Sequence, residues 1–236
     1  MDDFVSRDEK PKVRQIFMKS LRTNATGRRH RASGFSLMEV IVVLAISIVV
    51  SVISVISLVP MIAQYRIANA YNITLASMRQ ARDNAVSQRT SYQVTFTQTV
   101  TPPVTTTITV SPTLAGFAGD QNTVTYQLPN DVFYLVPPTG TTGPDGYGTG
   151  LNAIDFGYTA HASGGSQTVY FCPDGSAQDD STGNCLGNVD GGIVYIARAG
   201  DLLSSRAVTL WGATGRIRGW RLYPNGSGGY QWVRGQ

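Results

Sequence analysis

Gly34-Phe35-Ser36-Leu37-Met38-Glu39 leads into an uncharged apolar run from Val40 to Ile62. At about 1.5 Å per residue, a helix over this run covers roughly 34 Å, which is enough to cross a hydrocarbon core of about 30 Å. Four serines interrupt the run, but a serine hydroxyl in a helix can hydrogen-bond to a carbonyl of the preceding turn. The sequence therefore predicts a membrane-spanning helix over residues 35–62, with one carboxylate, Glu39, at its head.

Positive charge precedes the apolar run. Residues 1–34 contain nine basic and four acidic residues, a net charge of +5, whereas the rest of the chain contains ten basic and eleven acidic residues, a net charge of −1. Because positively charged flanks stay in the cytoplasm, we expect the N-terminus inside and the bulk of the chain exported. The sequence pI of about 9.2 comes from this leader and is no argument for a nucleic-acid partner. A start at Met18 instead of Met1, and a plain uncleaved anchor, both stay open.

The basic leader, the small residue, the phenylalanine and the lone carboxylate come in an order that resembles the N-terminal signal of type IV pilins and type II secretion pseudopilins. The resemblance implies cleavage after Gly34 by a prepilin peptidase and methylation of the new Phe35 amine. It also implies that Glu39 pairs with the Phe35 amine of a neighbouring subunit, since opposite charges attract strongly in a low dielectric. The alternative is a Glu39 carboxylate that is merely solvated at the headgroup boundary.

The helix is expected to continue beyond Pro60 over residues 63–90, with a changed pattern. Apolar residues recur there at the spacing of one helix face, while the opposite face carries Arg79, Arg82 and other polar residues that we expect to be solvated. The apolar stripe predicts contact with a sheet. It consists of Ile67, Tyr71, Leu75, Met78, Ala81 and Ala85.

From Ser91 onward, apolar and polar residues alternate between turn-rich stretches, which is typical of strands. Residues 91–236 are therefore predicted to form one exported, twisted antiparallel β domain, large enough for a core. The expected fold class is α+β, a long N-terminal transmembrane and assembly helix packed on this β domain, as in pilins. The strand candidates are Tyr92–Phe96, Thr105–Val110, Thr123–Leu128, Val132–Val136, Ala153–Tyr158, Thr168–Phe171, Ile193–Arg198, Ala207–Trp211, Arg216–Tyr223 and Tyr230–Val233.

Several segments sharpen the resemblance toward minor pilins of the GspH/FimT type. The Pro-, Thr- and Gly-rich insertions at residues 98–122 and 137–150 have no counterpart in it. The similar segments are Ser77–Val86 on the helix and Phe171–Ala177, Gly192–Ile196, Arg206–Leu210 and Thr214–Arg218 in the β domain.

Two cysteines, Cys172 and Cys185, flank a polar loop. An exported chain with two cysteines in this arrangement is expected to form one disulfide. The loop also contains Asp174, Asp179, Asp180 and Asn184, whose oxygens suit Ca²⁺, but their order matches no EF-hand spacing. We therefore expect no metal and keep calcium as the alternative.

Catalysis has little support in the sequence, because His161 is the one histidine after the leader and no nucleophile, phosphate-loop or zinc motif is present. We expect a non-enzymatic subunit without a cofactor. It would sit in a bacterial inner membrane with its N-terminus in the cytoplasm, and later in a periplasmic or extracellular filament. There it would help to initiate or cap a type IV pilus or a type II secretion pseudopilus. Its partners would be the prepilin peptidase, the membrane and other major and minor pilins or pseudopilins.

A second function stays open, a minor pilin that binds DNA during uptake. Its phosphate contacts would come from Arg216, Arg218 and Arg221 in the late Gly-Arg-x-Arg segment. Strand alternation places Arg216 and Arg218 on one face and Arg221 on the other. The alternative is that these arginines form an ordinary solvated strand face.

Overall fold

The computed structural model describes residues 34–113, 123–137, 141–148, 151–157, 159–161, 165–179 and 182–235. The leader over residues 1–33 and parts of both insertions lie outside the described residues. The chain divides into two units, the first ending at Val50 and the second beginning at Ser51.

One helix, α1 (Leu37–Gln88), begins in the first unit and ends in the second. Every residue from 34 to 62 is exposed, and an 18-residue window of α1 reaches a mean hydropathy of 3.0 with none of it buried. The Ser47 and Ser57 hydroxyls donate to the carbonyls of Val43 and Ser54, at 2.7 and 3.0 Å, as the sequence predicts. The helix is thus long and apolar enough to cross a membrane.

The second half of α1 buries one face in the β domain. Ile67, Met78, Ala81 and Ala85 of the predicted stripe are buried, whereas Tyr71 and Leu75, predicted on the same stripe, are only partly buried. Ala70, Thr74 and Ser77 take the centre of the face instead. Sequence reasoning passed over the two hydroxyl residues as polar. Both satisfy their hydroxyls within the helix, Thr74 with the Ala70 carbonyl and Ser77 with the Thr74 carbonyl.

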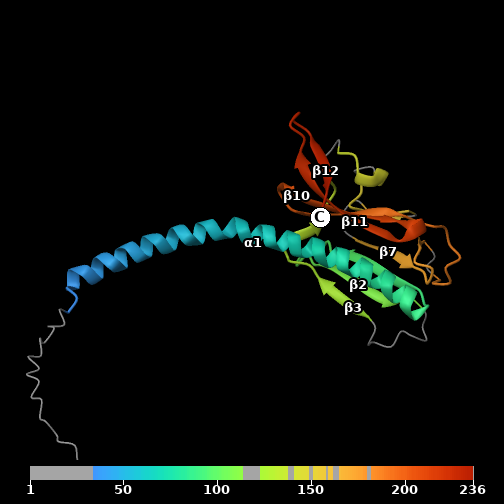
Figure 1. Cartoon of the computed structure of the whole chain (residues 1–236), viewed down its shortest axis with the longest axis horizontal. Coiled ribbons are helices and arrows are strands. Elements are labelled where there is room, and N and C mark those ends of the chain that lie inside the picture. Colours follow the sequence, from blue (N-terminus) through green and yellow to red (C-terminus); the bar gives the residue numbers. More distant parts are fainter. Residues whose placement is uncertain are drawn as a thin grey trace, which may run out of the picture. The chain divides into compact units, whose positions relative to one another are not determined.

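The strands form two antiparallel sheets, so the α+β class is confirmed (Figure 1). The five-stranded sheet runs in the order β3-β2-β1-β7-β8 and consists of β1 (Tyr92–Gln98), β2 (Thr106–Pro112), β3 (Val124–Gln127), β7 (Gly165–Phe171) and β8 (Ala177–Gln178). The seven-stranded sheet runs in the order β12-β11-β10-β9-β5-β6, with β4 also paired to β9. It consists of β4 (Val132–Tyr134), β5 (Ile154–Phe156), β6 (Thr159–His161), β9 (Gly192–Arg198), β10 (Asp201–Trp211), β11 (Arg216–Pro224) and β12 (Tyr230–Arg234).

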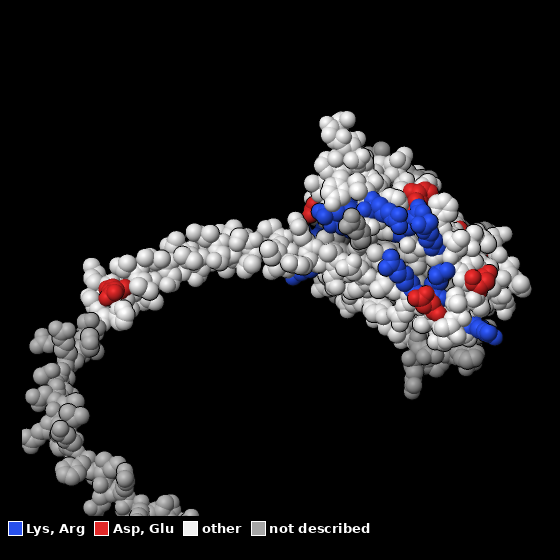
Figure 2. All heavy atoms as spheres, in the orientation of Figure 1, with Lys and Arg blue, Asp and Glu red and all other residues white. Residues whose placement is uncertain are grey.

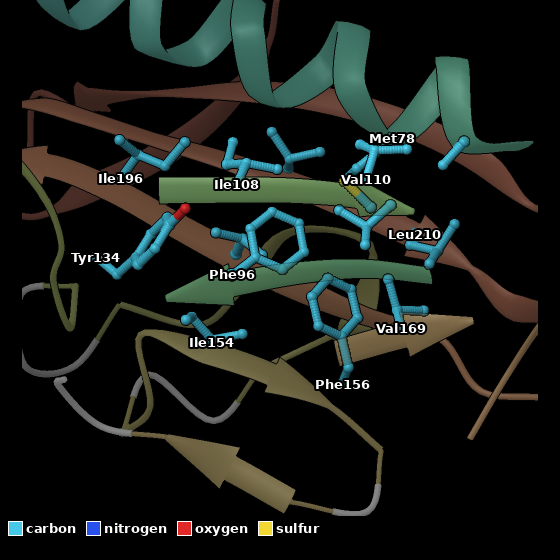
Figure 3. Close-up of a cluster of buried hydrophobic side chains, with 14 of the residues drawn as sticks. Met78, Phe96, Ile108, Val110, Tyr134, Ile154, Phe156, Val169, Ile196 and Leu210 are labelled. Carbon is cyan, nitrogen blue, oxygen red and sulfur yellow. The ribbon is translucent and has the colours of Figure 1, made fainter. Parts of the chain in front are cut away.

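One hydrophobic core joins the two sheets and α1, and a smaller cluster of Ile193, Tyr195 and Ala207 is separate from it. Figure 3 shows Met78 of α1 above side chains from both sheets, among them Phe96 of β1 and Leu210 of β10. Phe96 lies at the centre, with its ring stacked on Phe156 at 5.6 Å and edge-on to Tyr134 at 5.9 Å between centroids. The aromatic side chains of this core come from the strands, whereas three of its five alanines come from the helix, so the two surfaces interlock.

Two strand predictions differ from the structure for reasons that the backbone shows, while β7 begins three residues before its predicted start and β8 was not predicted. The strand predicted over Ala153–Tyr158 forms only over β5, because Gly157 at φ +44° turns the chain toward β6, which the prediction did not include. β10 begins at Asp201, six residues before the predicted start. Between Asp201 and Arg206 its register against β9 shifts, and the chain stays extended through this irregularity. Residues 202–205 have no register partner on β9. Such a bulge breaks the alternation on which strand prediction depends.

Arg82 of α1 connects three of the segments that carried the family resemblance. Its Nε donates to the Gly175 carbonyl at 3.3 Å and its Nη2 donates to the Thr214 carbonyl at 3.2 Å. Gly175 lies in the turn between β7 and β8, and Thr214 ends the short 3₁₀ turn η3 (Gly212–Thr214) before β11. Gly215 has φ +57°, and a Cβ there would lie 2.1 Å from the Gly175 carbonyl oxygen. The segments thus meet at one junction, where glycine is required.

This junction predicts unequal costs for two glycine substitutions. Gly215→Ala is expected to lower the free energy of unfolding by about 2 kcal/mol more than Gly226→Ala, because only Gly215 faces a backbone atom. Gly226, at φ +74° with open space around it, is the control for backbone strain alone. Chemical denaturation of the full chain in detergent, followed by near-UV circular dichroism, measures both; equal losses would contradict the close approach.

Candidate functional site

Glu39 lies in the first turn of α1, five residues after Gly34, where cleavage is expected. Its amide donates to the Ser36 carbonyl at 2.9 Å, and Phe35 and Glu39 border one shallow depression of the helix surface with Val43. The spacing of Ser36 and Glu39 is also that of a capping box, and an acid in the first turn suits the helix dipole. Glu39 therefore suits a local role, stabilising the N-terminus of α1, in addition to the expected contact between subunits.

The surroundings of Glu39 make its charge unusual. It forms no ion pair among the described residues, and the sequence contains no basic residue between Phe35 and Arg66. A carboxylate in an apolar stretch is costly unless a partner neutralises it. The nearest amine that the chain could supply is the one that cleavage after Gly34 would create at Phe35.

Arginines gather on one face of the globular part, over α1 and the C-terminal strands (Figure 2). The three arginines predicted for DNA binding are separated within this region. Arg216 is exposed and lines a depression of about 340 Å³ with Arg79, Arg82 and Asp83 of α1. Neither Arg79 nor Arg216 has a hydrogen-bond or ion-pair partner in the part of the chain that the structure describes.

Arg218 is held by an acid from the second insertion. Its Nη1 donates to Asp145 at 2.6 Å, and its guanidinium lies 5.8 Å from the centroid of the Trp211 ring. Asp145 also accepts from the Thr209 hydroxyl, which in turn accepts from Trp220 Nε1. The Asp145 side chain is only 8% exposed and that of Arg218 is 21% exposed. This charge is neutralised inside the domain, so Arg218 is poorly placed to contact a phosphate.

Arg221 lies on the opposite face of β11, as alternation predicts. It is the cross-strand partner of Arg206 on β10, and its guanidinium lies 5.0 Å from the Tyr223 ring centroid. Arg206 is 8% exposed, and nothing in the sequence indicated this burial, because the predicted strand begins one residue later, at Ala207. Arg79 was also missed, because its helix position read as an ordinary solvated face. Its spacing from Arg82, three residues on, was the available signal that both point toward β11.

The structure joins Cys172 and Cys185 in a disulfide. Two acids that were considered as calcium ligands have local partners. Asp174 accepts from the amide and hydroxyl of Ser176, which lowers the pKa of its carboxyl, and Asp179 accepts from the Asn188 amide. Within the described ranges no three His, Cys, Asp or Glu side chains come together as a metal site, and Asp180 lies outside them.

The Asp145–Arg218 pair predicts a specific loss of stability. Asp145→Asn is expected to lower the free energy of unfolding by about 2 kcal/mol, because it leaves the Arg218 charge largely buried without a counter-ion. Asparagine tolerates the φ of +58° at this position, so backbone strain does not explain the loss. Adding Arg218→Gln to Asp145→Asn should recover part of it in a double-mutant cycle. Additive single effects would show that the pair is not coupled.

Comparison with protein-family models, with curated proteins and with solved structures found no match for this chain.

Proposed function

We propose that this chain is a non-enzymatic filament subunit, a minor pilin or pseudopilin that inserts in the inner membrane and helps to initiate or cap a type IV pilus or type II secretion pseudopilus. One observation carries the proposal. Residues 34–62 are exposed along their whole length and carry a single charge, whereas the same helix continues into the core of a β domain. We call the exposed apolar residues 34–62 the bare half of the helix. A helix with such a half suits a subunit whose bare half is covered by lipid or by other subunits.

Two environments would cover the bare half in turn. Lipid acyl chains would cover it in the membrane, and the apolar halves of neighbouring subunits would cover it in the filament. The step between them needs no catalytic group, but it needs a contact that sets the register of one helix against the next. Glu39 suits this role, because it is the one charge in the stretch and the Phe35 amine of a processed neighbour would neutralise it.

Glu39→Val separates insertion from assembly. The variant is expected to enter the membrane and to be cleaved after Gly34 like the unmodified chain, because it removes a charge from an apolar segment. Its recovery with the other filament subunits should fall at least about tenfold, since the register contact is lost. N-terminal mass spectrometry reads processing, and affinity purification of the assembled subunits reads recovery.

The matched control is Asp83→Asn, which removes an exposed acid from the C-terminal half of the same helix. It should be processed and recovered normally. Normal recovery of Glu39→Val, or an uncleaved terminus in cells with an active prepilin peptidase, would contradict the proposal.

A second function, DNA binding, is favoured by the depression at the Arg82 junction. Arg79 and Arg216 line it from different elements and lack protein partners among the described residues, as a phosphate site requires. The structure thus changes the residue set expected from the sequence. Arg79 takes the place of Arg218, whose charge is satisfied by Asp145.

The DNA function predicts a charge-specific loss. Replacing Arg79 and Arg216 by Gln should weaken duplex binding and lower the slope of log affinity against log salt by about 0.9 for each lost phosphate contact. Arg221→Gln, the same change on the opposite face of β11, should leave the slope unchanged. Gel-shift titration of the full chain in detergent at two salt concentrations measures this. No shift of the unmodified protein at low salt would exclude it.

A further inference from the structure

A second depression, of about 340 Å³, lies where the apolar run meets the globular domain. It is lined by Met61, Gln64, Tyr65 and Ala68 of α1 and by Arg206 and Arg221 of β10 and β11. All of these residues belong to the second unit. The depression begins at Met61, in the last turn of the apolar run. It therefore lies at the C-terminal end of the predicted membrane-spanning segment.

The two arginines bring like charges together. Arg206 and Arg221 face each other across the β10–β11 pair, an arrangement that is unfavourable unless an anion compensates it. Neither forms an ion pair within the described ranges, and Asp201, whose negative charge acts on Arg206, is paired with Arg198 at 3.6 Å. Burial and then the Arg221 charge lower the pKa of Arg206 to about 10, so Arg206 stays positive at neutral pH.

Arg206 is fixed in place by the irregular part of β10. Its Nη1 donates to the carbonyls of Leu203, Ser204 and Ser205, which lie in the stretch without a partner on β9. The guanidinium thus satisfies backbone acceptors that the sheet leaves open, and its charge stays uncompensated. Arg221 stacks on Tyr223 and has no hydrogen-bond partner among the described residues, so its donors are available to a ligand.

The height of the depression along α1 indicates which anion fits. Gln64 and Ala68 follow Ile62 by two and six residues, which is roughly 3–9 Å along a helix. The headgroup layer extends about 5–8 Å beyond the hydrocarbon core on each side of a bilayer. Tyr65, which is 69% exposed, has the character of the aromatic residues that lie at this level. The phosphates of the outer leaflet would therefore lie beside the two arginines.

We propose that this depression binds the phosphate of an anionic phospholipid headgroup at the exported face of the membrane. Arg221 donates a hydrogen bond to the phosphate, and Met61 contacts the start of an acyl chain. The positive charge of Arg206, which is buried beside Arg221, adds electrostatic attraction for the phosphate. The inference depends on the membrane insertion in the proposed function. It adds a lipid contact that would hold the base of the β domain against the bilayer before assembly.

The test uses the full, unprocessed chain in a mild detergent, with native mass spectrometry counting retained lipid. Phosphatidylglycerol should bind more tightly than phosphatidylcholine, and Arg221→Gln should weaken phosphatidylglycerol binding about tenfold, the effect of losing one charge-assisted hydrogen bond. Arg234→Gln, the same change at an exposed arginine of β12 that lines neither arginine depression, should bind like the unmodified protein. Near-UV circular dichroism without lipid confirms that both variants fold.

Equal retention of the two lipids, or equal losses in the two variants, would overturn the proposal. Displacement of phosphatidylglycerol by excess inorganic phosphate would show a general anion site instead of a lipid site, and a loss of duplex DNA binding in Arg221→Gln with unchanged lipid binding would assign the depression to nucleic acid. The assay needs neither cleavage nor assembly. A failed Glu39→Val experiment would therefore count against the proposed function and leave this result intact.

Discussion

The small side chains on one face of α1 determine how the helix fits the two sheets. Ala70, Ala81 and Ala85 leave room for the large strand residues around Phe96, and Thr74 and Ser77 are admitted because each hydroxyl bonds back to its own helix. Since the same face continues to the Arg82 junction, the helix also sets where the ends of both sheets meet. Both arginine depressions are lined partly by α1, so their shape depends on this fit.

The sequence predicted what depends on long, regular patterns. The apolar run, the helix that follows it and most strands have a clear period over many residues, and hydroxyl bonding within the helix was correctly expected at Ser47. The buried face of α1 was predicted only in part, because a pattern of recurring apolar residues omits Thr74 and Ser77, whose side chains are polar. The β5–β6 hairpin and the first part of β10 were missed where a glycine turn or an irregularity interrupts the alternation.

The candidate sites were harder to predict because they depend on contacts between distant segments. Arg216 and Arg218 lie two residues apart, so strand alternation places them on one face. Asp145, in a loop 73 residues from Arg218, nevertheless forms an ion pair with Arg218 and not with Arg216. No local pattern shows that Asp145 will reach β11. The same holds for Arg82, whose two acceptors come from turns 93 and 132 residues away. The sequence singled out Arg216 and Arg218, and the fold determined which of the two remains available.

The absence of basic side chains between Phe35 and Arg66 has a consequence for how subunits would recognise one another. In the proposed filament each subunit presents one acceptor, the Glu39 carboxylate, and one donor, the Phe35 amine, within a surface that is otherwise interchangeable apolar contact. Sliding one helix along another changes the apolar contacts little, but it leaves both charges unpaired. In such a filament the pair would set the axial offset between neighbouring subunits, and the surrounding apolar surface would supply most of the contact area.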